Sequence, residues 1–414
     1  MADCIVPEGY KKTLLGVIPK EWKVKRLEFL CSNKGDYGIN APAVTYSKDL
    51  PTYLRITDID DDGRFITVNK TSVNSSNSEN FHLQEGDIVF ARTGATVGKT
   101  YLYNPNDGDL VFAGFLIRFS PDIQKIIPSF LRAYTNTSIY WNWVKIISQR
   151  SGQPGINAAE YCSLQIPVPP LKEQQKIVKI LSVWDKAIEK QTQLIEKLEL
   201  RKKGLIQQLL TGKKRLPGGS GEWKKIAIKD FAIDISLKNT HNENWEVLSC
   251  TKYDGLVPSL QYFGRQVFSK DITQYKIVPQ YCFAYATNHI EEGSIGYQST
   301  YRNALISPMY TVFKTDSNVI DDIFLYKLLK SHRAIYLYNV MMEGSIDRRG
   351  GLRWDNFSTI KFLLPDIKEQ SAIADILVSC DNEILLAKQK LNKFRQQKKG
   401  LMQVLLTGKK RVNI

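Results

Sequence analysis

A glycine-containing loop is the first segment whose residue types could carry out chemistry. It runs from Thr93 to Thr100, reads TGATVGKT and resembles a phosphate-binding loop, in which backbone N–H groups and a lysine hold the phosphates of a nucleotide. That motif needs four residues between its two glycines, whereas only three separate Gly94 from Gly98. No strand–helix–strand pattern follows the loop either. We therefore expect no nucleotide site in this segment.

Metal binding and nucleophilic catalysis are the next possibilities. Asp58, Asp60, Asp62 and Gly63 imitate the start of a calcium-binding loop, but the twelfth position is Asn69 instead of a bidentate glutamate. The residues around this run favour strands, so a β-hairpin turn is the better interpretation. The four histidines are scattered without metal-ligand spacing: His82, His241, His289 and His332. The sequence also lacks a GxSxG motif and a glycine-rich S-adenosylmethionine loop, so we predict no catalytic residue and no metal site.

Length and composition are those of a folded chain with more than one domain. At roughly 150 residues per domain, 414 residues correspond to two or three domains. The longest apolar run, Leu110 to Ile117, is much shorter than the roughly 18 residues that a membrane span needs. The six cysteines lie far apart with no CxxC pair: Cys4, Cys31, Cys162, Cys250, Cys282 and Cys380. We therefore expect a cytoplasmic protein with reduced thiols and no membrane partner.

The charge is strongly positive and unevenly distributed. The formal net charge is +15, which favours a polyanionic partner, most often a nucleic acid, although many basic proteins bind none. Residues 172–215 carry a net charge of +7 and residues 368–411 carry +6, so all other residues together hold only +2. For most single lysines in these two segments, a solvated helix face is the competing interpretation.

These two basic segments are copies of each other. Aligned without gaps at an offset of 196, positions 172–215 and 368–411 are identical at 22 of 44 places. Both copies open with Lys-Glu-Gln and close with Leu-Leu-Thr-Gly-Lys-Lys-Arg. Proline stands shortly before each copy, and a glycine followed by cations ends it, which is typical of the start and the end of a helix. We predict one long helix in each copy.

Apolar residues recur along both predicted helices at alternating steps of four and three. A spacing of 3.5 residues held over this length predicts a coiled-coil seam. The seam residues are Ile177, Leu181, Trp184, Ile188, Ile195, Leu198, Leu205 and Leu209, then Ile373, Leu377, Ile384, Leu391, Phe394, Leu401 and Leu405. Gln191, Lys202 and Lys398 interrupt the seam, and polar seam positions commonly fix the register. We expect the two copies to pack against each other in antiparallel orientation.

The segments before the two helices, 1–165 and 216–362, are alike in layout but differ in sequence. Both mix short β-branched and aromatic runs with Gly, Asn and Asp turns, which predicts strands. A more helical stretch follows in each, near Ile127–Ser148 and Ile320–Met341. Each segment is therefore expected to be an α/β globular domain.

The beginning of the chain looks like a continuation of its own end. Glu21-Trp22-Lys23 resembles Glu222-Trp223-Lys224, which follows the first Thr-Gly-Lys-Lys-Arg. The predicted fold class is therefore α+β: two α/β domains joined by two long antiparallel coiled-coil helices, with a circular, pseudo-twofold internal repeat.

These repeated motifs resemble the specificity (S) subunit of Type I restriction-modification systems. The resemblance rests on the Pro-x-x-Lys-Glu-Gln entry to each helix, the Lys-Lys-Gly-Leu and Leu-Leu-Thr-Gly-Lys-Lys-Arg exit, and the opening Gly9 to Trp22, and it covers the whole chain. It implies two target recognition domains, 1–165 and 216–362, and two conserved helical regions, 166–215 and 363–414.

The same resemblance implies a function and partners. The chain would be a non-catalytic subunit that binds double-stranded DNA, reads a bipartite asymmetric target with a spacer of fixed length, and assembles with two methyltransferase (M) subunits and with restriction (R) subunits. No cofactor is implied for this chain, whereas S-adenosylmethionine, ATP and Mg are implied for the partners. A scaffold with two protein-binding domains and an unrecognised nuclease or methyltransferase are the alternatives.

Loops with polar and basic side chains are the candidates for DNA contact, because base edges are read by such groups. In the first domain they are Arg92, Thr93, Thr96, Lys99, Gln149, Arg150, Ser151 and Gln153; in the second they are Asn288, His289, Arg302, Arg348, Arg349 and Arg353. Arg92 and Arg349 are the candidates for bidentate pairing with guanine. For each single residue, solvated surface or a structural hydrogen bond is the competing interpretation.

Overall fold

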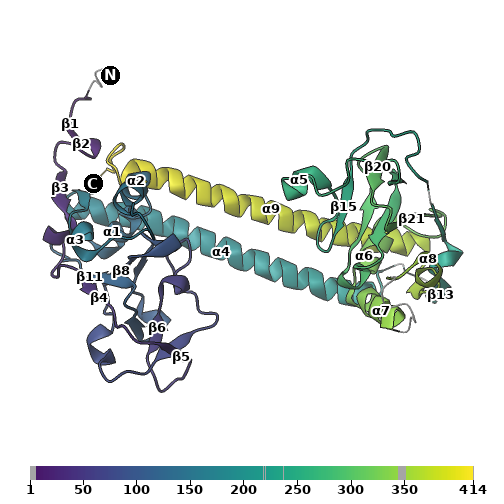
Figure 1. Cartoon of the computed structure of the whole chain (residues 1–414), viewed down its shortest axis with the longest axis horizontal. Coiled ribbons are helices and arrows are strands. Elements are labelled where there is room, and N and C mark those ends of the chain that lie inside the picture. Colours follow the sequence, from purple (N-terminus) through teal and green to yellow (C-terminus); the bar gives the residue numbers. More distant parts are fainter. Residues whose placement is uncertain (1–5, 218, 220, 236, 344–350, 414) are drawn as a thin grey trace. The chain divides into compact units, whose positions relative to one another are not determined.

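The computed structural model describes residues 6–217, 219, 221–235, 237–343 and 351–413 (Figure 1). They form two compact units, the first from Met1–Thr192 with Gln389–Ile414 and the second from Gln193–Lys388. Both long helices are present, α4 over Leu171–Leu209 and α9 over Ile367–Leu405, each of 39 residues. Every unit therefore contains one part of α4 and one part of α9.

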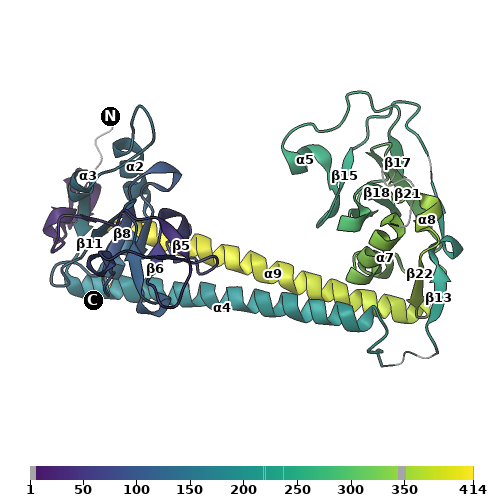
Figure 2. The ribbon, with the colours of Figure 1, turned by 60° about the horizontal axis from the view of Figure 1, so that its bottom comes forward.

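Within each unit the two helices lie side by side and antiparallel, as predicted (Figures 1 and 2). In the first unit, the ring centroids of Trp184 and Phe394 are 5.8 Å apart in an edge-on contact. In the second unit, Nζ of Lys388 lies 2.6 Å from a carboxylate oxygen of Glu199. The later part of α9 thus faces the earlier part of α4 in the first unit, and the earlier part of α9 faces the later part of α4 in the second unit.

The predicted seam residues make up the contact between the helices. Most of them are buried: Ile177, Leu181, Ile188, Ile195, Leu198, Leu209, Ile373, Leu377, Ile384, Leu391 and Leu405. The others are half-buried: Trp184, Leu205, Phe394 and Leu401. The 3.5-residue spacing therefore identified the packed face of both helices correctly.

The two lysines that interrupt the seam pair with aspartates of the facing helix. Nζ of Lys398 lies 2.6 Å from Asp185 in the first unit, and Lys202 contacts Asp381 in the second. Asp381 also accepts a hydrogen bond of 2.5 Å from Lys327. Burial alone would raise the pKa of Asp381, but the hydrogen bonds and charges of Lys202 and Lys327 outweigh it and hold that pKa below its ordinary value.

The glutamate of each Lys-Glu-Gln motif is a buried anchor point. Glu173 accepts a hydrogen bond of 3.0 Å from the indole N–H of Trp22, and Glu369 accepts one of 3.3 Å from that of Trp223. The two Glu-Trp-Lys segments that look alike in sequence thus occupy the same place in the two units.

The glutamine of each motif connects its helix to the globular part of the same unit. The Gln174 side chain accepts a hydrogen bond of 2.8 Å from the backbone N–H of Ile127, which precedes α1. Gln370 does the same with the backbone N–H of Asp321, which precedes α6, also at 2.8 Å. A neutral, fully buried amide can satisfy such backbone groups at no cost in charge burial.

The first unit contains two four-stranded sheets, two two-stranded sheets and three short helices besides α4 and α9. The central sheet has the order β4-β11-β8-β9, formed by Asp36–Tyr37, Leu116–Phe119, Ile88–Ala91 and Thr100–Leu102. The second has the order β10-β6-β7-β5, formed by Leu110–Phe112, Thr52–Leu54, Thr71–Val73 and Ala43–Thr45. The remaining elements are β1 (Tyr10–Thr13) with β2 (Gly16–Pro19), β3 (Lys23–Arg26) with β12 (Gln165–Val168), α1 (Pro128–Tyr134), α2 (Ser138–Ile147) and α3 (Ala158–Cys162).

The second unit repeats the central sheet in the same order. This sheet, β14-β21-β18-β19, consists of Ala232–Asp234, Tyr310–Thr315, Cys282–Ala286 and Ile295–Gln298. The remaining elements are β13 (Lys224–Ala227) with β22 (Lys361–Leu364), β15 (Leu248–Thr251) with β16 (Gly255–Pro258), β17 (Lys276–Pro279) with β20 (Asn303–Ile306), α5 (Ser259–Phe263), α6 (Asp322–Leu329), α7 (His332–Glu343) and α8 (Trp354–Phe357). The predicted α+β fold class is therefore confirmed, with each predicted helical stretch divided into two helices.

The acidic run from Asp58 to Gly63 is a turn, as the sequence analysis favours. Ile59 and Phe65 form an antiparallel bridge across it, and Gly63 has a φ of 68°. The strands expected on either side of this turn, Leu54–Ile56 and Phe65–Val68, are not formed as predicted: β6 ends at Leu54 before a 3-10 turn, and Phe65 makes only the isolated bridge. Asp61, at the tip of the turn, lies 2.6 Å from Nζ of Lys99. In the described part of the chain, no helix combines the length and the apolar character of a membrane span.

Candidate nucleic-acid interface

The end of β8 in the first unit and the end of β18 in the second carry candidate residues, and at both ends the carbonyl of the first residue after the strand accepts a hydrogen bond from a distant loop. After β8, the N–H of Arg92 donates to the carbonyl of Phe115 at 3.0 Å, and the carbonyl of Arg92 accepts from Ile156 at 2.8 Å. After β18, the carbonyl of Thr287 accepts from Leu352 at 2.9 Å. In the first unit, these contacts join the end of β8 to the turn before β11 and to the loop before α3.

In the first unit the structure brings both predicted loops together. The backbone of Thr93 forms a β-bridge with Gly155, and the N–H of Gly94 donates to the carbonyl of Pro154 at 3.0 Å. The side chain of Gln153 lies over Gly94, because an added Cβ there would be 2.9 Å from Nε2. The segments 92–99 and 149–155 therefore form one surface, which sequence spacing did not reveal.

Two of the three predicted cations on this surface are already paired. Lys99 is held by Asp61, and Arg150 binds both carboxylate oxygens of Glu160 at 2.5 and 2.7 Å. The guanidinium of Arg92 instead lies over the ring of Tyr37, 4.8 Å from its centroid. Among the described residues, no acidic side chain forms an ion pair with Arg92, unlike Lys99 and Arg150.

In the second unit the structure brings together only part of the predicted set. Asn288 and His289 directly follow β18, and Gly351 lies against Asn288, since an added Cβ would be 2.4 Å from its Oδ1. Arg353, two residues further along, is exposed and begins α8. Arg302 lies elsewhere, because its carbonyl accepts from the N–H of Gln280 before the start of β18. The predicted Arg348 and Arg349 lie outside the described residues.

His289 also belongs to a group that the sequence analysis did not identify. With Glu291 and Glu292 it places one ligand atom per residue within 4.8 Å of one another, and these are atoms that could hold a metal ion. His289 and Glu292 are exposed, and exposed acidic groups commonly form such clusters without a metal.

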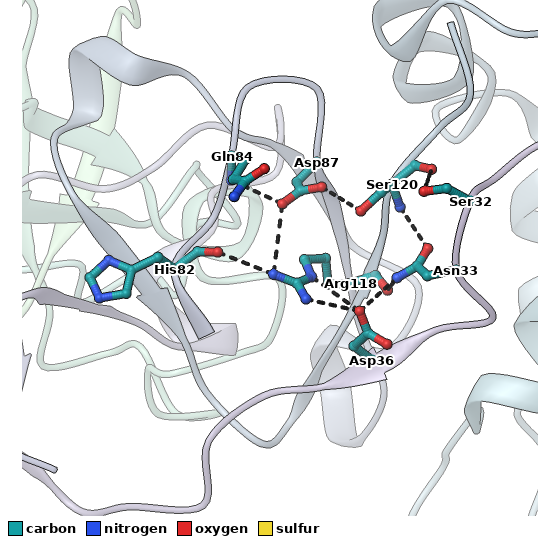
Figure 3. Close-up of polar contacts among 8 residues, drawn as sticks. All are labelled: Ser32, Asn33, Asp36, His82, Gln84, Asp87, Arg118 and Ser120. Carbon is teal, nitrogen blue, oxygen red and sulfur yellow. Dashed lines mark hydrogen bonds and ion pairs between the residues drawn. The ribbon is translucent and has the colours of Figure 1, made fainter. Parts of the chain in front are cut away.

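A polar network joins β4 and β11 to the segment before β8 (Figure 3). Arg118 on β11 donates to Asp36 on β4 at 2.9 Å and to the carbonyl of His82 at 3.1 Å. The buried carboxylate of Asp87, just before β8, accepts a hydrogen bond of 2.6 Å from Ser120. Tyr37, over whose ring Arg92 lies, directly follows Asp36 on β4.

Two exposed apolar side chains at matched places were missed by the sequence analysis. Phe115 precedes β11 and is 57% exposed, and Met309 precedes β21 and is 61% exposed. The carbonyl of Met309 accepts a hydrogen bond of 2.9 Å from the side-chain hydroxyl of Thr287, whereas that of Phe115 accepts one of 3.0 Å from the backbone N–H of Arg92. A large apolar residue at a turn next to a buried strand is the only sequence signal that these positions give.

Known proteins resemble this chain along most of its length. The family model for the Type I restriction modification DNA specificity domain matches residues 19–200. The MjaX and MjaVIII type I restriction enzyme specificity subunits of Methanocaldococcus jannaschii are 26% and 25% identical, covering 98% and 95% of this chain and 97% and 94% of their own lengths. The solved structure of a Type I restriction-modification system S subunit from M. genitalium has a TM-score of 0.55 at 14% identity, covers 93% of this chain and 96% of its own, and supports the fold.

The repeated helices, the matched ends of β8 and β18, and these relatives all agree. Residues 19–200 match the Type I restriction modification DNA specificity domain, and the chain is similar over most of its length to type I restriction enzyme specificity subunits.

Proposed function

We propose that this chain reads a bipartite, asymmetric DNA target in which a spacer of fixed length separates two half-sites. The carrying observation is that two matched strand ends, each held to a distant loop through the carbonyl of its first following residue, present different side chains, Arg92 and Thr93 in one unit and Thr287 and Asn288 in the other. Matched strand ends that carry different side chains suit two different half-sites. The recognition domains are placed at 1–165 and 216–362, and the helical regions at 166–215 and 363–414.

Each recognition domain would read base edges in the major groove, where the donor and acceptor patterns distinguish all four base pairs. Lysine and arginine contacts to phosphates would position the domain without selecting a sequence. The exposed Phe115 and Met309 suit apolar contact with thymine methyl groups. The two helices would keep the two domains at a fixed separation and so set the spacer.

Two methyltransferase subunits and the restriction subunits are the proposed protein partners, in the cytoplasm. Large apolar side chains stand exposed on the helices, among them Leu194, Leu200, Leu385 and Leu386, with exposed fractions of 45–70%. Exposed leucines on two adjacent helices would suit a surface that another protein covers. Methyl transfer from S-adenosylmethionine and Mg-dependent ATP hydrolysis are assigned to those partners.

A methylation assay tests this function. The purified chain alone should methylate no DNA, and the chain with an added M subunit should methylate one bipartite sequence. DNA affinity should also fall steeply with salt, because cationic contacts to phosphates release counterions. Methylation by the chain alone would support the enzyme alternative, and the absence of any salt-dependent DNA binding would support the protein scaffold.

A further inference from the structure

The cation at the end of β8 is held in one orientation before any ligand binds. The backbone of Arg92 is fixed on both sides, by Phe115 and by Ile156. Its guanidinium stacks on Tyr37, whose hydroxyl accepts a hydrogen bond of 3.1 Å from the N–H of Ala158. A side chain held in this way loses little conformational freedom when it contacts a ligand.

The hydrogen-bonding groups of Arg92 are also unusual. Its Nε is buried and has no hydrogen-bond partner, so its two terminal nitrogens are left as the groups that can reach a ligand. Two parallel N–H donors of a guanidinium match the O6 and N7 acceptors of guanine in the major groove. The neighbouring Lys99 and Arg150 differ, because Asp61 and Glu160 already take up their donors.

The matched strand end in the second unit carries no guanidinium. Oγ1 of Thr287 is engaged with the carbonyl of Met309 and lies 3.3 Å from Oδ1 of the next side chain, Asn288, which is exposed. An asparagine amide offers one donor and one acceptor, which match N7 and N6 of adenine. The same strand end would therefore select different bases in the two half-sites.

We infer that Arg92 reads a guanine in the half-site of the first unit, and that Asn288 reads an adenine in the half-site of the second. This inference rests on the proposed function, and it names the bases that neighbouring positions of the two matched strand ends select.

Methylation of a duplex pool with randomised half-sites, by the chain assembled with its M subunits, tests the inference. Arg92→Ala should remove the requirement for one guanine in one half-site and lower the rate on the wild-type target about 10- to 100-fold. Arg92→Lys should keep a weaker guanine preference, because lysine also donates to guanine. Asn288→Ala should relax one adenine in the other half-site only.

Arg26→Ala on β3 is the matched control and should leave the selected sequence unchanged. An unchanged guanine requirement in Arg92→Ala would overturn the inference. So would an equal loss of rate on all sequences in both Arg92→Ala and Arg92→Lys, because that result marks a phosphate contact or a structural role. A wild-type complex that methylates all sequences equally would instead contradict the proposed function itself.

Discussion

Arg411 donates two hydrogen bonds to the buried carboxylate of Glu173, at 3.2 and 2.8 Å. The repeat counterparts of these two residues form the same pair: Arg215, 196 positions before Arg411, donates to Glu369, 196 positions after Glu173, at 2.7 Å from both Nε and Nη2. The last residue of each Thr-Gly-Lys-Lys-Arg motif thus binds the glutamate that begins the other helix. The Lys-Glu-Gln motif and the Thr-Gly-Lys-Lys-Arg motif therefore act together: in each unit, their ion pair joins the start of one helix to the segment that follows the end of the other.

Removal of Arg411 should weaken the first unit locally. The loss of one partner from a fully buried ion pair costs about 3–5 kcal/mol. Since the Arg411 side chain is 33% exposed, we expect about 2 kcal/mol for Arg411→Ala. Hydrogen exchange of the segments 19–26 and 165–180 measures this loss. The neighbouring Lys410→Ala should change it by less than about 0.5 kcal/mol, and equal effects of the two variants would show that the pair is unimportant.

The glycines of the two Thr-Gly-Lys-Lys-Arg motifs should differ in their tolerance of a side chain. Both have positive φ, 74° at Gly408 and 70° at Gly212. An added Cβ would lie 2.4 Å from Pro19 at Gly408 but 3.3 Å from Trp223 at Gly212. We expect Gly408→Ala to cost about 2–4 kcal/mol and Gly212→Ala about 1–2 kcal/mol, from left-handed strain plus overpacking.

Gly400→Ala is the control for these two variants, because Gly400 lies inside α9 with nothing within 4 Å of an added Cβ. Alanine should stabilise the helix there by up to about 1 kcal/mol. Thermal unfolding of the three variants provides the comparison. A Gly408→Ala protein as stable as the Gly400→Ala protein would contradict the packing at this turn.

The long helices could be predicted because their signal is local and repeated. The apolar spacing of 3.5 residues and the offset of 196 each point to the same packed face, and the two lysines in the seam stand out as exceptions. The partners of those lysines, Asp185 and Asp381, were not predicted, because an antiparallel pairing joins positions far apart in sequence.

The recognition surface could be predicted only as a set of loops. Polar and basic residues at turns marked the loops 92–99 and 149–155, but their junction depends on backbone contacts over about 60 residues of chain. The pairings of Lys99 with Asp61 and of Arg150 with Glu160 decide which cation is left for a ligand. Tyr37, which supports Arg92, gave no signal in the sequence because its role comes from the sheet order β4-β11-β8.

The paired Asp381 should make the second unit sensitive to acid. Its pKa is lowered from the ordinary 3.8, so its contribution to stability is fully present above that value and is lost as the pH falls through the lowered pKa. The difference in urea midpoint between the wild type and Asp381→Asn should thus stay constant from about pH 7 to pH 5 and shrink below about pH 4. A difference that grows as the pH falls would contradict the sign of this shift.

Insertion of one heptad within 186–200 should lengthen the spacer of the DNA target. Seven residues keep the seam in phase and add roughly 10 Å to α4. At about 3.4 Å per base pair, this is at most about three base pairs, and one unmatched helix should reduce it. We predict a spacer longer by roughly one to three base pairs with both half-sites unchanged.

A two-residue insertion in the same segment is the control for the heptad. It rotates the seam by about 200° and should abolish assembly, since each residue turns a helix by about 100°. An active heptad variant with an unchanged spacer would show that the M subunits, and not these helices, set the distance.

The most direct test of the account is an exchange of residues 1–165 for the first recognition domain of another family member, followed by methylome sequencing of cells that express the chimera with its M subunit. The account predicts that one half-site changes to that of the donor, while the other half-site and the spacer stay the same. A change in both half-sites, or in neither, would contradict independent reading by the two domains.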